Sequence, residues 1–266
     1  MIVKSHAWLC YLAGFTALVG VASAGDLRVN AIARDQRTQE LLYVESHLIQ
    51  NVGKSSEQRV VLYRCSIDGP AFARKELHYG TAREAPEFTL FDARNGYIEG
   101  LRRTAQGLRV FQRTDARTAQ RESAIAVDAP LVVDAGFDDF VRARWNELEA
   151  GRTVRFSFLV PSRLDALTFK IHKHHESSID GMTVSVIRLT LSGVLGWVLP
   201  YIDVSYRKSD RMLLRYVGLT NMRDAKGENH IAVIDFPTAE RRETTVDLAA
   251  ARAEPLTARC PAPRAS

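Results

Sequence analysis

The stretch FTLFDARNGYIEGLR, residues 88–102, carries the strongest hairpin signal in the chain. Asn95 and Gly96 stand at its centre, and both residue types tolerate the positive backbone φ angles of a tight turn. The runs on either side, Phe88–Ala93 and Tyr97–Arg102, are short and contain aromatic and apolar residues, as strands do. The stretch therefore predicts two adjacent antiparallel strands.

The same rhythm of short apolar runs and turn residues continues along most of the chain. Further runs begin at Leu41, Gln58, Ala71, Gly107, Arg121, Arg152, Leu167, Met182, Tyr201, Arg211 and His230. This pattern predicts a mainly β fold, a curved antiparallel sheet (half-barrel) with one or two covering helices. Because no repeat and no linker divides the chain, we expect a single antiparallel β domain over residues 25–240 and a C-terminal tail over 241–266.

One segment, DAGFDDFVRARWNELEAG at residues 134–151, has the period of a helix instead. Its apolar residues fall on one helical face: Phe137, Phe140, Val141, Trp145 and Leu148. Asp134 is the expected N-cap and Gly151 the expected C-terminal stop. The segment predicts a helix near residues 136–150 whose apolar face packs on the sheet.

Residues 1–24 have the order of a secretory signal peptide. Lys4 precedes an apolar run over 7–22, and Ala22-Ser23-Ala24 is a small-x-small cleavage pattern. The alternative is an N-terminal membrane anchor, for which the run is short. We expect cleavage after Ala24, a mature chain in the periplasm and no membrane span in that mature chain.

Removal of residues 1–24 leaves two cysteines, Cys65 and Cys260. An exported chain with an even number of cysteines can form a disulfide. Two unpaired thiols are the alternative, since a sequence does not place the two Cα atoms at bridging distance.

The charge pattern argues against a nucleic-acid partner. The formal net charge is +5, but the 36 Lys and Arg residues are scattered among 31 Asp and Glu residues. No basic block and no interleaving of aromatic with basic residues marks a nucleic-acid surface. Weak attraction to anionic lipid head groups is left open.

Three of the histidines lie in FKIHKHHESS, residues 169–178. In a strand, His172 and His174 share the face opposite Phe169 and Ile171, at a spacing that could chelate a metal. Lys170 lies on the same face and its charge opposes a cation, and no HExxH motif or cysteine pair accompanies the histidines. We therefore expect a polar strand end and no metal site.

Sequence templates for catalysis are also missing. The chain lacks GxSxG, SxxK and a phosphate-binding Gly-rich loop. No catalytic residue and no cofactor is predicted, and the chain is not expected to be an enzyme.

The stretch GVLGWVLPYI, residues 193–202, is free of charge and contains two Gly and one Pro. It is either a buried crossover or bulged strand, or an apolar loop at the mouth of a cavity. On the second interpretation, a ligand-binding cavity is expected to be lined by Phe140, Trp145, Leu195, Trp197 and Val198.

The stretch VSYRKSDRMLLRYVGLTN, residues 204–221, and the order of elements over 41–236 resemble the half-barrel of the LolA/LolB lipoprotein-carrier superfamily, especially its uncharacterised periplasmic members. The resemblance implies an apolar concavity between sheet and helices that binds acyl chains. Our leading hypothesis is thus a periplasmic binding protein with an acyl or other lipid-like ligand. The alternative is an interaction module that docks an envelope protein through a sheet edge or the Trp197 loop.

Overall fold

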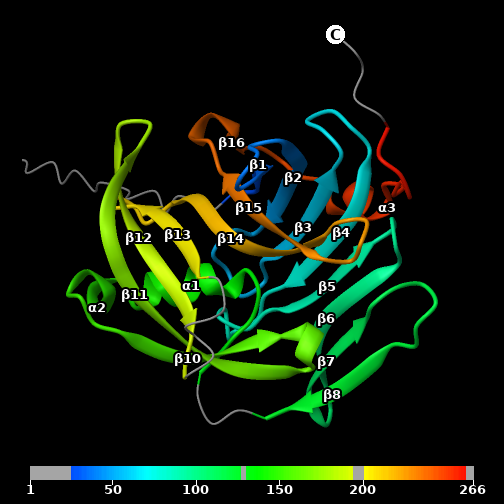
Figure 1. Ribbon diagram of the computed structural model, residues 1–266, viewed down its shortest axis with the longest axis horizontal. Helices are drawn as coiled ribbons and strands as arrows, with labels where there is room; N and C mark the ends of the chain where they lie inside the picture. The colour runs from blue at the N-terminus through cyan, green and yellow to red at the C-terminus, as the bar shows by residue number, and fades with distance from the viewer. Residues whose placement is uncertain (1–24, 127–129, 194–200, 262–266) are drawn as a thin grey trace, which may run out of the picture.

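The computed structural model describes residues 25–126, 130–193 and 201–261. Within them, sixteen strands form one sheet in the order β8-β7-β6-β5-β4-β3-β2-β1-β15-β14-β13-β12-β11-β10-β9, with β16 beside β1 (Figure 1). The strands are β1 Leu27–Asp35, β2 Leu41–Gln50, β3 Gln58–Arg64, β4 Ala71–His78, β5 Glu87–Asp92, β6 Tyr97–Thr104, β7 Gly107–Arg113, β8 Arg121–Ile125, β9 Leu131–Val132, β10 Val154–Val160, β11 Asp165–Ile179, β12 Met182–Leu191, β13 Ile202–Arg207, β14 Leu213–Arg223, β15 Asn229–Asp235 and β16 Arg241–Glu243. The helices are α1 Gly136–Ala143, α2 Trp145–Glu149 and α3 Leu248–Ala253, and the short 3-10 turns are η1 Pro161–Arg163 and η3 Thr238–Glu240.

The hairpin predicted around Asn95 and Gly96 is confirmed. Strands β5 and β6 pair antiparallel from Phe88↔Leu101 to Asp92↔Tyr97, with a four-residue loop between them. Gly96 takes a φ of 77°, which a side chain would disfavour, and the Asn95 side chain accepts a hydrogen bond from the Tyr97 amide at 2.9 Å. The antiparallel pattern holds for every strand pair described except β9 with β10, which are parallel.

The sheet curves until its two halves face each other. Strand β1 lies in the middle of the order and pairs with both β2 and β15. The half from β2 to β8 and the half from β10 to β15 extend from it on opposite sides (Figure 1). The turn η1, between β10 and β11, lies against β6 and β7, so the far ends of the sheet approach each other. The predicted curved antiparallel sheet with a few helices is confirmed.

Strand β1 is absent from the predicted set of strands. Its inward-facing residues alternate correctly, but two of the four are alanines, Ala31 and Ala33. Alanine favours strands less than Val, Ile or the aromatic residues do, so the run has a weak β signal. The two alanines are fully buried, which places the strand in the centre of the sheet.

The predicted helical face packs on the sheet as expected. Phe140, Val141, Trp145 and Leu148 are buried and form a core with residues of β10 to β13, among them Phe156, Ile171, Ile187 and Tyr206. The segment forms two helices instead of one, because the backbone leaves helical geometry at Arg144. The Arg144 side chain pairs with Glu84 in the other half of the sheet, whereas Trp145 packs on Tyr206.

The start of α1 differs from the prediction. Asp134 is not the N-cap: that position is Ala135, and no side chain caps the helix. The Asp134 carboxylate instead accepts two hydrogen bonds from Lys75 of β4. Gly136 approaches the backbone of Glu84 so closely that a Cβ atom would lie 2.3 Å from the Glu84 carbonyl oxygen. The predicted stop at Gly151 is confirmed, since α2 ends at Glu149 and Gly151 has a φ of 76°.

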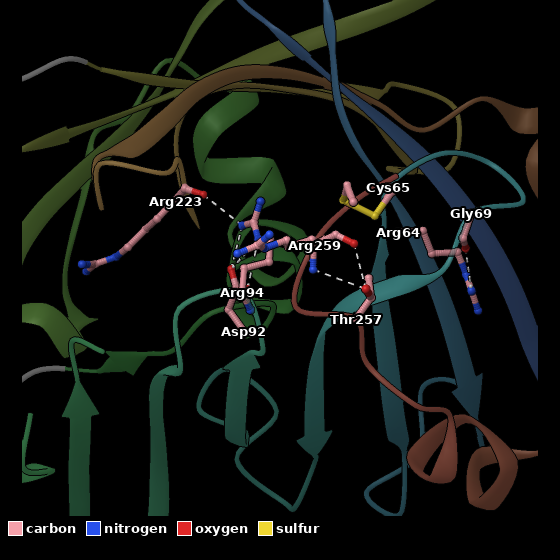
Figure 2. Close-up of a disulfide and its surroundings, with 9 residues drawn as sticks. Arg64, Cys65, Gly69, Asp92, Arg94, Arg223, Thr257 and Arg259 are labelled. Atoms are coloured by element: carbon pink, nitrogen blue, oxygen red, sulfur yellow. Dashed lines mark hydrogen bonds and ion pairs between the residues drawn. A yellow bond between two sulfur atoms is a disulfide. The ribbon is translucent and has the colours of Figure 1, made fainter. Parts of the chain in front are cut away.

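The C-terminal segment is attached to the outside of β3 and β4. A disulfide joins Cys65 to Cys260, with Cα atoms 5.5 Å apart (Figure 2). Helix α3 covers an apolar group on these strands, consisting of Val60, Leu62 and Ala71 with Val246, Leu248 and Ala251. Glu254 receives two hydrogen bonds from Arg64, at 2.6 and 2.8 Å. Among the described helices, none has the length and apolar character needed to cross a membrane.

We expect Trp145→Ala to lower the free energy of unfolding by about 3–5 kcal/mol, because it removes a buried indole from the core beneath the helices. The Trp145 side chain is only 6% exposed. Urea denaturation, followed by circular dichroism, measures the change.

Ile67→Ala is the control, because Ile67 is 62% exposed. It is expected to cost less than about 0.5 kcal/mol. An equally small loss for Trp145→Ala would contradict the packing described for α2.

Candidate functional site

A cavity of about 410 Å³ lies on the inner face of the curved sheet. Its walls come from β1 to β6 on one side and from β10, β12 to β15 and α1 on the other. The volume is within the range of small-molecule sites, which is roughly 300–1,000 Å³. The cavity therefore exists because the two halves of the sheet face each other without packing together completely.

The wall of the cavity from β10 to β15, together with Phe137 of α1, is largely apolar. It includes Phe137, Phe158, Leu189, Val204, Leu213 and Ile234. These side chains point inward because alternate residues of a strand share one face, as Ile202 and Val204 do in β13. This wall offers a surface on which a hydrocarbon chain can be removed from water.

The wall from β2 to β6 contains a buried charged group that we call the Lys75 cluster: Lys75, Asp134, Glu45 and Glu99. The Lys75 Nζ lies 2.9 Å from both carboxylate oxygens of Asp134. Burial opposes the charge of Lys75, but the nearby Asp134 and Glu45 carboxylates outweigh it, so the lysine pKa is raised. Glu45 in turn contacts His47 at 2.8 Å.

Glu99 is the third carboxylate of the Lys75 cluster, and among the residues that the structure describes it has no basic partner at contact distance. It accepts hydrogen bonds from the Tyr97 hydroxyl and, at 3.3 Å, from the Asn221 side-chain amide. Burial raises the pKa of Glu99, because the charged form is poorly solvated inside the protein. The cluster thus has more acidic than basic groups.

A second charged group, the arginine cluster, lies where α1 meets β3 and β16. It consists of Arg59, Arg83, Arg142 and Arg241 with Glu57, Asp138 and Asp139, all in the cavity wall. Glu57 is buried and pairs with Arg59 at 2.9 Å and with Arg83 at 2.8 Å. Arg83 also reaches Asp139 of α1 at 3.1 Å. The cluster therefore joins β3 and the β4–β5 connection to the helix.

The structure places two of the predicted lining residues, Phe140 and Trp145, apart from this cavity. Phe140 and Trp145 are in the helix–sheet core, where Phe140 packs on Phe156 with ring centroids 4.5 Å apart, and neither residue is in the cavity wall. The reason is that α1 turns Phe137 and its acidic residues toward the cavity and its remaining apolar residues toward β10 to β13. Leu195, Trp197 and Val198 lie outside the described residues.

The histidine pair is on the opposite face of the sheet from the cavity. Ile171 is buried toward the core, whereas His172 is half-buried and His174 exposed, with ring centroids 6.2 Å apart. The histidines are not at the end of the strand, as the sequence suggested, because the strand continues to Ile179 after a bulge near His174. No group of three or more metal-ligating side chains occurs within the part of the chain that the structure describes.

The charged cavity residues escaped prediction, although the sequence holds a signal for them. Glu99 stands between Tyr97 and Leu101, and Lys75 between Ala73 and Leu77, all on the buried face of their strands. A charged residue whose neighbours at i−2 and i+2 are buried must face inward. The signal is visible only once the inner face of each strand is known.

Comparisons with known proteins were made for the family, for curated relatives and for solved structures. No family model and no curated protein matches the chain. Three similar structures are a β-barrel-like protein of the domain of unknown function DUF1849 from Brucella abortus, a putative outer membrane lipoprotein-sorting protein domain from Vibrio parahaemolyticus and a DUF1329 family protein from Desulfovibrio piger.

The likeness to these structures is distant. The TM-scores are 0.47, 0.33 and 0.30, in the same order, and the sequence identities are 5%, 10% and 12%. The matches cover 80%, 86% and 84% of this chain and 98%, 90% and 87% of the respective other chain.

We expect Lys75→Met to lower the free energy of unfolding by about 3–5 kcal/mol, because it leaves the Asp134 carboxylate without its partner in a buried site. The double variant Lys75→Met/Asp134→Asn should lose less, since position 134 no longer carries an unpaired charge. Asn suits position 134 because the backbone φ there is 44°. Urea denaturation of both variants tests this, and a double variant less stable than the single one would contradict it.

A second prediction concerns pH. Because the pKa of Glu99 is raised in the folded state, its protonation stabilises the fold at low pH, and this contribution is lost as pH rises above the ordinary value of 4.5. Glu99→Gln removes this dependence. Relative to the wild type, the variant should therefore become more stable between about pH 4 and about pH 7, measured by thermal or urea unfolding.

Glu122→Gln serves as the control for the pH series, because Glu122 is an exposed carboxylate on β8. It should show no such trend. A constant difference between Glu99→Gln and the wild type across the pH range would mean that Glu99 titrates as it does in the unfolded chain.

Proposed function

We propose that this chain is an exported periplasmic binding protein that holds an apolar or lipid-like ligand in the cavity between the two halves of its sheet. The observation that carries the proposal is the cavity itself, with an apolar wall on the β10–β15 side and charged and polar groups on α1 and on the opposite side. In a small-molecule site, apolar surface gives affinity and polar groups fix orientation.

Export is supported by two observations that do not depend on the cavity. The first 24 residues have the pattern of a cleaved signal peptide. The Cys65–Cys260 disulfide suits an oxidising compartment such as the periplasm. Both are consistent with a carrier or receptor that acts in the cell envelope.

The described residues also favour a binding role for the cavity over a purely structural one. Leu219 lines the cavity and is 42% exposed, so apolar surface continues from the interior to the outside of the protein. A ligand with a hydrocarbon chain would cover such surface and gain roughly 25 cal/mol for each Å² removed from water.

The test is a fluorescence titration with 1-N-phenylnaphthylamine, a neutral apolar probe that brightens in an apolar site. The wild type should bind the probe, and Leu213→Gln should weaken binding by roughly tenfold or more, because it replaces an apolar wall residue by a polar amide. Ile231→Gln is the matched control on the neighbouring strand: Ile231 is 41% exposed and is not in the cavity wall.

Two results would count against the proposal. The first is that the wild type does not bind the probe and that native mass spectrometry detects no lipid on protein purified from its own periplasm. The second is equal binding by the wild type and Leu213→Gln. A stable protein partner in the first case would favour the alternative function, an envelope protein-interaction module.

A further inference from the structure

We propose that the ligand has an anionic head group, a carboxylate or a phosphate, bound by Arg59, Arg142 and Arg241 at the rim of the cavity, while its hydrocarbon chain extends along the apolar wall. The inference rests on the proposed function and adds to it the chemical class of the ligand and its orientation.

Arg241 carries a charge that no neighbouring carboxylate among the described residues balances. It pairs with Val29 of β1 across the β1–β16 ladder, and both side chains are in the cavity wall. The next residue, Arg242, pairs with Arg28 and therefore faces the other side of the sheet. Within the residues that the structure describes, Arg241 makes no ion pair, whereas Arg59, Arg83 and Arg142 each do.

The carboxylates of the arginine cluster are already engaged by other groups. Glu57 is bound by Arg59 and Arg83, and the Asp138 carboxylate accepts the Tyr206 hydroxyl at 2.8 Å. Arg142 reaches Asp138 only at 3.5 Å. Four arginines thus share three carboxylates, so positive charge exceeds negative charge in this part of the wall.

The three arginines that we propose bind the head group also lie close enough to repel one another. Burial lowers the pKa of Arg241, and the charges of Arg142 and Arg59 lower it further. The Nε of Arg59 is buried and has no hydrogen-bond acceptor. A buried donor without an acceptor and a group of like charges are both unfavourable, and a bound anion would relieve the repulsion.

Arginine is well suited to such an anion, because its planar guanidinium donates two parallel hydrogen bonds to a carboxylate or a phosphate. The opposite part of the cavity would repel the same anion, since the Lys75 cluster contains Glu45, Glu99 and Asp134 against one lysine. Charge therefore fixes the orientation: the head group lies at Arg241 and away from Lys75.

Apolar side chains adjoin the arginines, as an amphiphile requires. Ile49 pairs with Arg59 across the β2–β3 ladder, and Val29 pairs with Arg241. Phe236 and Leu213 continue the apolar surface toward the interior. The first methylene groups of an acyl chain would contact these residues as soon as the head group reached the arginines.

The experiment compares three ligands with the same C12 chain: dodecanoate, dodecyl phosphate and dodecanol. Each displaces 1-N-phenylnaphthylamine from the wild type, from Arg241→Gln and from the control Arg242→Gln. In the wild type, at least one anion should bind roughly tenfold more tightly than dodecanol, as expected for hydrogen bonds between charged groups. Arg241→Gln should abolish this preference and leave dodecanol binding unchanged, and Arg242→Gln should keep the preference.

The two anions distinguish the possible head groups. Preference for dodecanoate identifies a fatty acid as the ligand class, and preference for dodecyl phosphate identifies a phospholipid. Equal binding of all three ligands by the wild type would overturn the head-group site while leaving the proposed function intact. If none of the three ligands displaces the probe or binds, both the head-group site and the proposed function are overturned. If Arg241→Gln and Arg242→Gln have the same effect, the preference for anions depends on overall charge and not on Arg241, which also overturns the head-group site.

Discussion

The buried ion pair between Lys75 and Asp134 is the contact on which the arrangement of the cavity depends. It joins β4, in one half of the sheet, to the residue that precedes α1, at the entry to the other half. Both side chains are nearly inaccessible, with 11% and 12% of their surface exposed. The pair is supported by Val133, whose amide donates to the Glu84 carbonyl at 2.9 Å, and by Arg83, which binds Asp139. These contacts hold α1 between the two halves.

A sheet of this size has to curve, and its interior is then hard to fill. Strongly twisted sheets of more than about ten strands curl or split. Here one half is filled by the core beneath α1 and α2, and the other by the aromatic and aliphatic side chains of β1 to β8. The space between these two cores is the cavity, and some of its charged groups also hold α1 in place. Lys75, Asp134 and Arg83 thus both position the helix and form part of the polar wall of the cavity.

Such a polar interior is not explained by stability alone. A buried ion pair contributes little net stability, because the loss of hydration offsets much of the attraction between the charges. Well-packed apolar residues at these positions would hold the sheet at least as well. The lining of the cavity nevertheless contains four arginines and six acidic residues. Local rules of folding are most often broken at functional sites. The charged wall is therefore the part of the molecule that a binding role explains best.

Much of the fold follows from the sequence, whereas the site does not. The Phe88–Arg102 hairpin and the 134–151 helical segment have strong local patterns, and both occur where they are expected. The apolar helix face, however, has the same pattern whether it packs in a core or lines a cavity, so periodicity alone could not tell which of these two environments Phe140 and Trp145 have. Arg59, Lys75 and Arg241 line the same cavity only through strand register, which no local pattern supplies.

The most direct test of the account is a crystal structure with dodecanoate that carries bromine on its terminal carbon, because the anomalous signal of bromine locates the end of the chain. The account predicts a bromine peak inside the cavity, against the apolar wall of Val204 and Leu213, with the carboxylate beside Arg241. A peak on the outer surface of the sheet, or in the core between α1 and β10 around Phe140, would contradict it.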